Sequence, residues 1–446
     1  MQHGNDKQTR SLYTLILSTV GCCLLFILSA CGQSAILTSN SLNASHIKSN
    51  TTISNVSKRV TTAPMPPTQT NCPANGQGRA AIFAPLSLGS HQNLVYVYNA
   101  SGSASLKRVD TTTGTTTTII SLGNGATIHS AQLSTDGQFI LFVTQYANHA
   151  QLQMVRLDGQ GLQTLYCAEP MNGLPSSAIT NALWSPNQQL AVFEETNPGG
   201  GPGAPLVRLY NLLTGTVLTY ISPTTRMGYT PQQWLNDTEI YMTGSYTSLV
   251  APPANVFILD ITKGPNQINN TRQIAAIEGY NWEMNISADH TKLILSQSAD
   301  NADNTELAAP SIISSQNVTG GVLNPIYISH VFAVTQVRAI SSTALLMVLG
   351  GQTGGLPEDG LWKINMDGTG LVHLTYDGRL LSSTRNTWSS VSRDGKLYAA
   401  IGYDNTGVEN TAPYKVLYGP LSGGATTQVA LTNRGETAEI AGWTTF

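Results

Sequence analysis

Two neighbouring carboxylates, Glu194 and Glu195, directly follow the apolar segment Leu190–Phe193. Paired carboxylates suit acid and base catalysis, and their oxygens are ligands that Ca²⁺ accepts. Charged side chains solvated in a loop are the ordinary alternative, and the sequence favours that interpretation here.

Other patterns that catalysis or metal binding would need are missing from the sequence. It contains no Gly-x-Ser-x-Gly and no His-Glu-x-x-His, and its eight histidines are scattered singly. The glycine-rich stretch 198–203 lacks the Lys-Ser/Thr of a phosphate-binding loop. The turn residues Asp158, Asp260 and Asp367 are better explained by side-chain hydrogen bonds that fix turns. We therefore expect no catalytic residue set, no metal and no cofactor.

The composition argues against nucleic acid as a partner. The chain has 22 basic and 25 acidic residues, a net charge of -3 and no basic cluster, whereas nucleic-acid-binding proteins carry a basic patch or stripe. Only 11% of the residues are charged, against about 25% in a typical soluble domain. Such a composition suits an exported protein.

The first 31 residues have the organisation of an export signal. Lys7 and Arg10 precede an uncharged, mostly apolar run from 12 to 28. The run leads into Leu28-Ser29-Ala30-Cys31, which resembles the lipobox of bacterial lipoproteins. The resemblance implies that residues 1–30 are a signal peptide, cleaved before a lipidated Cys31. A permanent membrane anchor is the alternative, because the apolar run approaches the roughly 20 residues that span a bilayer. We expect the mature protein at the extracytoplasmic face of the cell membrane.

Residues 31–78 read as a flexible tether from this lipid to a domain at 79–446. Ser, Thr and Asn dominate the segment, with prolines at 64, 66 and 67. It has too little apolar surface to offset the entropy of ordering. Of the five cysteines, two would be removed with the signal peptide and Cys31 would carry the lipid. Cys72 and Cys167 would then be the thiols of the mature chain. They are candidates for a disulfide in an oxidising compartment, and two unrelated thiols are the alternative.

A repeated unit runs through the domain. A residue pattern such as Leu133-Ser134-Thr135-Asp136-Gly137, followed by an apolar strand, recurs with its second residue at 134, 185, 235, 287, 341, 392 and 444. The steps of 50 to 54 residues each leave room for four short strands. Four-stranded repeats of this kind indicate a β-propeller, whose blades surround a central channel.

These motifs resemble the TolB-type β-propeller repeat, most clearly at 134–137, 184–187, 365–370 and 392–395. The resemblance covers nearly the whole domain and implies an all-β propeller. The period here is longer than usual for the family, and the α/β domain that accompanies the propeller in TolB has no counterpart. Six complete units begin near 129, 180, 230, 282, 336 and 387, and 439–444 looks like the first strand of a seventh.

Segments 94–98, 106–110 and 116–120 would complete that seventh blade, so the C-terminal strand is expected to pair with N-terminal strands and close the ring. Trp443 is expected to pack between blades. Six or eight blades are the alternatives. Closure removes exposed sheet edges, which are otherwise an aggregation hazard.

Propeller geometry implies a ligand site at the mouth of the channel where the first strands begin. The residues expected there are His129, Thr180, Tyr229, Tyr280, Trp282, Gln336, Arg385 and Glu439. Aromatic faces beside a few polar groups suit a protein loop or a sugar. Ordinary polar loops and core aromatics are the alternative.

Two classes of function follow. The first is a non-catalytic, membrane-tethered binding or scaffolding module for a cell-envelope protein or glycan, acting as a monomer that touches the membrane through its lipid alone. The second is a hydrolase or lyase whose site combines His129, Glu283, Arg338 and Glu439 from different blades. Fold alone does not choose between them.

Overall fold

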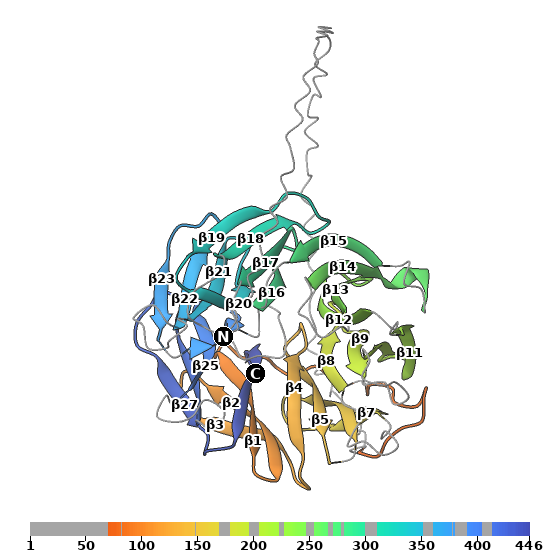
Figure 1. Ribbon diagram of the computed structural model, residues 1–446. Coiled ribbons are helices and arrows are strands. Elements are labelled where there is room, and N and C mark those ends of the chain that lie inside the picture. The colour runs from red at the N-terminus through yellow and green to blue at the C-terminus, as the bar shows by residue number, and fades with distance from the viewer. Residues whose placement is uncertain are drawn as a thin grey trace, which may run out of the picture. The chain divides into compact units, whose positions relative to one another are not determined.

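The computed structural model describes residues 70–81, 83–147, 149–168, 179–195, 205–222, 227–246, 254–265, 271–277, 281–298, 310–350, 360–376, 378–379, 390–403 and 413–446. Seven antiparallel sheets of four strands stand around a central channel, as Figure 1 shows. The predicted seven-bladed, all-β propeller is confirmed. No helix in these ranges is long and apolar enough to cross a membrane.

Blades 1 to 6 each use four consecutive strands, with the innermost strand first. Blade 1 is β4 (Thr127–Leu133), β5 (Phe139–Gln145), β6 (Ala150–Arg156) and β7 (Gln163–Ala168). Blade 2 is β8 (Ile179–Trp184), β9 (Leu190–Glu195), β10 (Leu206–Asn211) and β11 (Thr216–Ile221). Blade 3 is β12 (Met227–Trp234), β13 (Glu239–Tyr246), β14 (Ala254–Asp260) and β15 (Thr271–Ile277), with a 3-10 turn η1 (Ile261–Lys263) after β14.

The remaining blades follow the same plan. Blade 4 is β16 (Asn281–Ile286), β17 (Lys292–Ser298), β18 (Ser311–Asn317) and β19 (Asn324–Ser329). Blade 5 is β20 (Ala333–Ala339), β21 (Ala344–Gly350), β22 (Gly360–Asn365) and β23 (Val372–Thr375). Blade 6 is β24 (Gly378–Arg379), β25 (Leu397–Tyr403), β26 (Tyr414–Pro420) and β27 (Thr427–Leu431).

Blade 7 closes the ring from both ends of the domain. It consists of β28 (Thr437–Thr444), β1 (Asn93–Ala100), β2 (Ser103–Asp110) and β3 (Thr116–Leu122). The C-terminal β28 is innermost and runs antiparallel to β1, with Leu94 opposite Trp443. Trp443 is fully buried, and its ring meets Tyr418 of blade 6 edge-on. Both the predicted closure and the predicted packing of Trp443 between blades are confirmed.

The first strand of blade 6 departs from the expected repeat. β24 pairs with the far half of β25, and among the described residues the near half is met by an isolated bridge from Val391 to Tyr398. The first strand of this blade therefore begins at Gly378, not near 387.

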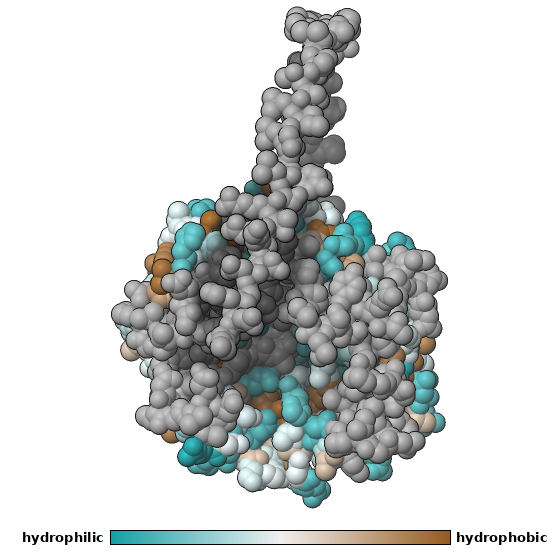
Figure 2. Space-filling view, in the orientation of Figure 1, coloured by the Kyte–Doolittle hydropathy of each residue, from teal (hydrophilic) through white to brown (hydrophobic). Residues whose placement is uncertain are grey.

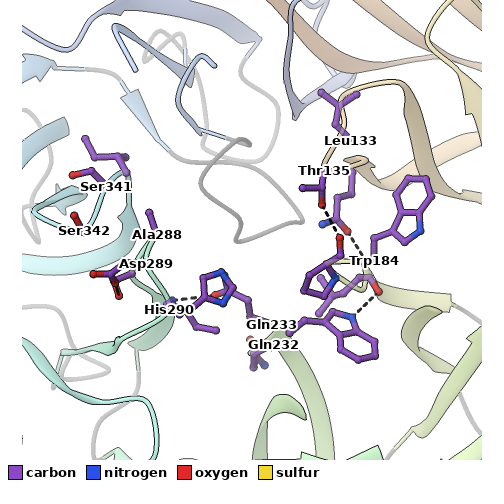
Figure 3. A pocket seen from close by; sticks show the side chains of 17 residues that line it. Leu133, Thr135, Trp184, Gln232, Gln233, Ala288, Asp289, His290, Ser341 and Ser342 are labelled. Carbon is purple, nitrogen blue, oxygen red and sulfur yellow. Dashed lines mark hydrogen bonds between the residues drawn. The ribbon is translucent and has the colours of Figure 1, made fainter. Parts of the chain in front are cut away.

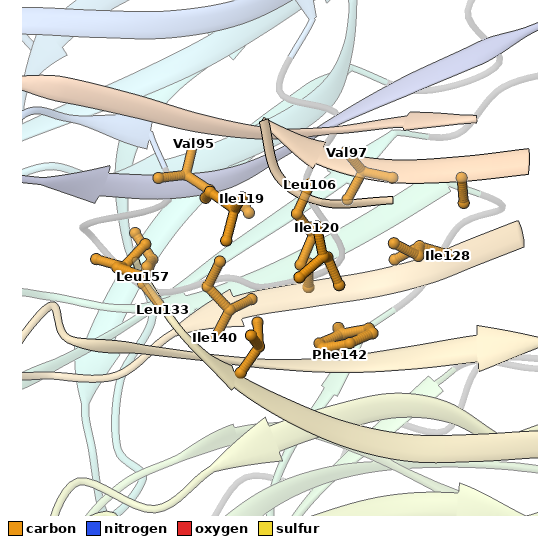
Figure 4. Close-up of a cluster of buried hydrophobic side chains, with 14 residues drawn as sticks. Val95, Val97, Leu106, Ile119, Ile120, Ile128, Leu133, Ile140, Phe142 and Leu157 are labelled. Carbon is orange, nitrogen blue, oxygen red and sulfur yellow. The ribbon is translucent and has the colours of Figure 1, made fainter. Parts of the chain in front are cut away.

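The core lies between the blades. Successive side chains of a strand point to opposite faces, so in β5 Ile140 and Phe142 pack toward blade 7 while Leu141 and Val143 pack toward blade 2. Figure 4 shows the first of these clusters, in which Val95 and Leu106 of blade 7 meet Ile128 and Phe142 of blade 1. Strands buried on both faces explain the nearly continuous apolar segments of the repeat.

The repeated motif builds the turn between the first two strands of a blade. Ser134 Oγ donates to Asp136 Oδ1 (2.5 Å) and accepts the N–H of Phe139 (2.9 Å). The same two bonds recur at Ser185, Ser287 and Ser392. Asp158, Asp260 and Asp367 likewise accept backbone N–H groups two residues on, which confirms their expected role in turns.

An N-terminal strap, residues 70–81 and 83–90, crosses blades 2, 1 and 7 before β1 begins. The N–H of Ala80 donates to Leu212 O (2.8 Å), and that of Leu86 donates to Gln138 Oε1 (2.7 Å). A disulfide joins Cys72 of the strap to Cys167 of β7. Ordered contacts thus begin before residue 79, where the sequence placed the start of the domain.

Candidate functional site

The inner edge of the channel is held by side-chain clamps that pass from one blade to the next. Gln132 Oε1 accepts the N–H of Trp184 (2.8 Å), and Gln233 Oε1 accepts that of Ile286 (3.1 Å). Asn285 Oδ1 accepts the N–H of Ala339 (2.7 Å). An innermost strand has no neighbouring strand on its channel side, so these carboxamide clamps satisfy donors that would otherwise face the channel unpaired.

An ion pair forms a further link between blades 4 and 5. Glu283 Oε2 accepts from Arg338 Nη1 (3.0 Å) and from the N–H of Val337 (2.8 Å). Both charged groups were expected in a site assembled from several blades, and the structure brings these two together.

The mouth predicted from the sequence is described only in part. His129 lies on β4, Gln336 on β20 and Glu439 on β28, all innermost strands. Tyr280 and Arg385 lie outside the described residues, and for Trp282 only the backbone, on β16, is described. The proposed use of this mouth therefore stays a prediction.

The prediction that Tyr229 lies at the channel mouth was wrong. Its side chain is only 4% exposed, and its ring packs edge-on against Phe257 of the same blade at 5.4 Å between centroids. The ring belongs to the core between blades 2 and 3 and does not offer a face to the channel. A sequence cannot separate a core tyrosine from a channel tyrosine at the start of a strand, because both positions alternate with apolar residues.

His129 sits in a β-bulge of β4, between Ile128 and Ser130, so its ring leaves the regular alternation. It keeps an exposed surface and contacts Thr127 Oγ1 through Nε2 at 3.2 Å. Desolvation by the surrounding protein lowers the pKa of its imidazole below the ordinary value of 6.5. The ring is therefore kept neutral to a lower pH than a free histidine.

Glu194 and Glu195 are not solvated loop charges, so that expectation was wrong. They end β9 at 5% and 2% exposure. Glu195 accepts from Arg208 Nε (2.6 Å) and from the Tyr166 hydroxyl (3.0 Å) of the neighbouring blade. Glu194 accepts from Thr180 Oγ1 (2.9 Å) and Asn181 Nδ2 (2.5 Å). The two buried carboxylates are thus bound to partners within blades 1 and 2 and are not solvated at a loop.

A cavity of about 550 Å³ opens at the other end of the channel, where the innermost strands end in their first turns. In Figure 3 Thr135 and Trp184 stand on one side, Asp289 and Ser341 on the other, and Gln233 between them. The lining comes from blades 1 to 5, namely Gln132, Leu133, Thr135, Leu183, Trp184, Pro186, Gln232, Gln233, Trp234, Ile286, Ser287, Ala288, Asp289, His290, Ile340, Ser341 and Ser342. We call this the turn-side cavity.

The turn-side cavity presents fixed donors and acceptors. The Oε1 atoms of Gln132 and Gln233 accept the hydrogen bonds of the clamps. Their Nε2 groups make no hydrogen bond within the described part of the chain. His290 Nδ1 donates to Leu235 O (2.8 Å), which leaves Nε2 as an acceptor on the neutral ring. Such groups suit a ligand rich in hydroxyls or amides.

Sequence reasoning missed this cavity. The usable signal was the carboxamide directly before the repeated motif, at Gln132, Gln233 and Asn285. The described surface of the face in Figure 2 mixes hydrophilic and hydrophobic residues, with no broad patch of either kind. Among the described residues no group of three or more His, Cys, Asp or Glu side chains is placed to hold a metal.

Comparison with known proteins places the fold. No family model matches the chain, and a search of curated proteins finds no match. Among solved structures it is similar to TolB from Acinetobacter baumannii, with 14% identity over 64% of this chain and 63% of TolB, at a TM-score of 0.42. The propeller that the sequence predicted is confirmed by the seven four-stranded sheets of the structure.

Two enzymes are also similar. An oligogalacturonate lyase solved with manganese is 12% identical over 78% of this chain and 86% of the lyase, at a TM-score of 0.50. A puromycin hydrolase is 13% identical over 78% of this chain, at a TM-score of 0.54, and this chain spans only 54% of its length. At these identities the likeness shows the propeller fold alone.

Proposed function

We propose that the protein is an exported, lipid-tethered propeller that binds a cell-envelope protein or glycan without chemical conversion. The turn-side cavity carries this proposal. Five consecutive blades supply its wall, and the carboxamide clamps that line it are also the bonds that lock neighbouring blades. A wall held in this way needs little ordering when a ligand binds, which favours affinity.

The ligand class follows from the groups that the cavity offers. Amide donors at Gln132 and Gln233 and an imidazole acceptor at His290 match the backbone amides of a protein loop or the hydroxyls of a sugar. Apolar side chains such as Leu133, Leu183 and Ile340 add contact area between them. This mixture is typical of sites that orient a ligand with a few polar contacts.

The test is affinity capture from envelope extracts of the host, with the full-length lipidated protein compared with a control of residues 31–78 alone. The informative variant is Gln132→Glu with Gln233→Glu, because a carboxylate still accepts the two clamp N–H groups but no longer donates. Gln273→Glu, an exposed position on the outermost strand of blade 3, is the matched control.

The wild type and Gln273→Glu should retain the same protein or glycan, and the double variant should retain it about tenfold more weakly. Equal retention by the double variant would place the ligand elsewhere. If the full-length protein holds nothing beyond the tether control, the binding-module proposal fails.

The lipid anchor has its own test. Radiolabelled palmitate should enter the wild-type protein and not Cys31→Ser, and only the former should sediment with membranes. A membrane-bound wild-type chain that still carries residues 1–30 and takes up no palmitate would support a permanent anchor instead.

A further inference from the structure

A second cavity, of about 620 Å³, opens beside blade 7, where β1 begins and β2 ends. Its walls come from the strap, from strands β1 to β3 and from residues 445–446. It shares no residue with the turn-side cavity. We call it the rim cavity.

Polar side chains line the rim cavity on the face that blade 7 turns toward blade 1. Asn93 of β1 lies opposite Asp110 of β2. Two residues earlier on β2, Arg108 lies between Val95 of β1 and Thr117 of β3. Opposite residues share a face of the sheet, as do residues two apart on a strand, so all five side chains point the same way. Val95 packs into the core shared with blade 1, whereas its four polar neighbours line the cavity.

Protein contacts fix the guanidinium of Arg108 and leave one of its edges free. Nη1 donates to the backbone oxygen of Phe446 (2.8 Å), and the guanidinium lies 4.4 Å from the centre of the Phe446 ring. Nε and Nη2 make no hydrogen bond within the described residues, and both nitrogens remain accessible to solvent. Their N–H groups point the same way, so this edge can donate to two oxygens at once.

Asn93 supplies an acceptor beside this pair of donors. The residue is only 6% exposed, and its Nδ2 donates to His91 O (3.1 Å). Its Oδ1 makes no hydrogen bond within the described part of the chain and stays accessible, in a side chain that lines the cavity. A nearly buried side chain with an accessible, unpaired acceptor is placed to bind a group inside the cavity.

His91 and Asp110 add a further acceptor. His91 Nδ1 lies 2.8 Å from Asp110 Oδ2. Desolvation acts to raise the pKa of Asp110, but hydrogen bonds from His91 and from two backbone N–H groups lower it to about 2. An ionised carboxylate only accepts, so Nδ1 carries the hydrogen, and Nε2 of the neutral ring is an acceptor.

From this geometry we propose that the rim cavity binds a neutral saccharide of one or two sugar residues. Two neighbouring hydroxyl oxygens accept from Nε and Nη2 of Arg108, and a hydroxyl hydrogen is donated to Asn93 Oδ1. The lining carries one guanidinium and one carboxylate side chain, so its charges balance and do not select an anion. The volume lies within the range of about 300–1,000 Å³ that is usual for small-molecule sites. This site does not depend on the function proposed for the turn-side cavity.

The experiment is a titration of the full-length protein, in micelles of a detergent without a sugar headgroup, followed by calorimetry. The neutral probes are maltose, cellobiose, lactose and diacetylchitobiose, and the anionic probes are glucuronate and inorganic phosphate. At least one disaccharide should bind saturably, with a dissociation constant near or below about 1 mM. Binding of an anion alone, or of none of the probes, would overturn the proposal.

Thr117 and Thr118 provide a matched pair of variants. The exposed side chain of Thr117 lines the cavity, whereas Thr118, opposite Lys107, points to the other face of the sheet. Thr117→Val removes a hydroxyl and keeps the shape of the side chain, so it should weaken disaccharide binding about threefold to tenfold. Thr118→Val makes the same change outside the cavity and should leave the affinity unaltered. Equal affinities of the two variants would contradict a site in the rim cavity.

Arg108→Lys tests the free guanidinium edge directly. Lysine keeps the positive charge but lacks the two parallel N–H groups, so the affinity should fall by at least about tenfold. Thermal unfolding of the variant shows whether the blade remains folded, and an unchanged affinity would rule out the role given to Arg108.

The double variant Gln132→Glu with Gln233→Glu separates the two cavities. It alters the turn-side cavity alone, so disaccharide binding at the rim cavity should be unchanged. If the double variant loses the disaccharide while Thr117→Val retains it, the sugar occupies the turn-side cavity. The inference about the rim cavity then fails, and the binding function proposed for the turn-side cavity stands.

Discussion

Arg393 of blade 6 donates from Nε to the carbonyl oxygen of Trp443 in blade 7, over 2.7 Å. Its two terminal nitrogens continue to blade 1, where they donate to Thr135 O (2.9 Å) and Ser134 O (3.2 Å). One side chain thus spans the closing blade and joins its two neighbours. Burial lowers the pKa of Arg393 to about 10, so it remains charged at neutral pH.

Replacing Arg393 should weaken ring closure. Arg393→Ala removes one hydrogen bond from each of three carbonyls, of which Ser134 O still accepts from the N–H of Gly137, and we expect a loss of about 2–4 kcal/mol in the free energy of unfolding. Urea unfolding followed by tryptophan fluorescence measures it. Lys396→Ala is the control, since this exposed side chain lies on the same turn, and it should change stability by less than about 0.5 kcal/mol. Equal effects of both would mean that closure rests on strand pairing alone.

The carboxamide clamps predict a difference between two substitutions at one position. Gln233→Leu removes the acceptor of the Ile286 N–H and leaves a donor unpaired at the inner edge, which should cost about 1–3 kcal/mol. Gln233→Glu keeps an acceptor and should cost less. Thermal unfolding of the wild type and both variants measures the two losses of stability. Similar losses for both variants would contradict the role of Gln233 as an acceptor in the clamp.

The propeller was readable from the sequence because its turn chemistry repeats. Ser134 and Asp136 bond to each other and to the following strand, and the same geometry demands the same residues in other blades. Their spacing fixed the number of blades. The start of blade 6 was hidden, since Gly378, which pairs with Gly402, carries no motif.

The site was harder to predict because its partners are remote in sequence. The sequence suggested a loop charge at Glu195, whereas in the structure its carboxylate pairs with Arg208 on the next strand. Glu283 meets Arg338 across 55 residues, a pairing set by the ring and not by any local pattern. Sequence periodicity locates blades, but the direction of a polar side chain at a bulge or an inner edge emerges only after the blades are assembled.

The disulfide between Cys72 and Cys167 should hold the strap against blade 1. Breaking it, by reduction or by Cys72→Ser with Cys167→Ser, should lower the free energy of unfolding by about 2–4 kcal/mol. Trypsin cleavage after the exposed Arg79 of the strap should then accelerate. Cleavage after the exposed Lys263, far from the strap in sequence, should not change and serves as the control. An unchanged rate at Arg79 would show that the hydrogen bonds of the strap suffice.

His129 should make the folded state sensitive to mild acid. Its pKa is lowered in the folded protein by desolvation, so below the ordinary value of 6.5 the unfolded chain binds a proton that the folded chain resists. Stability is therefore complete above pH 6.5 and falls as the pH drops from there toward the lowered pKa. His129→Gln should flatten this decline between pH 7 and pH 5 in thermal unfolding experiments, whereas His330→Gln, at an exposed position, should preserve it. If the decline of stability with falling pH persists unchanged in His129→Gln, protonation of His129 is not its cause.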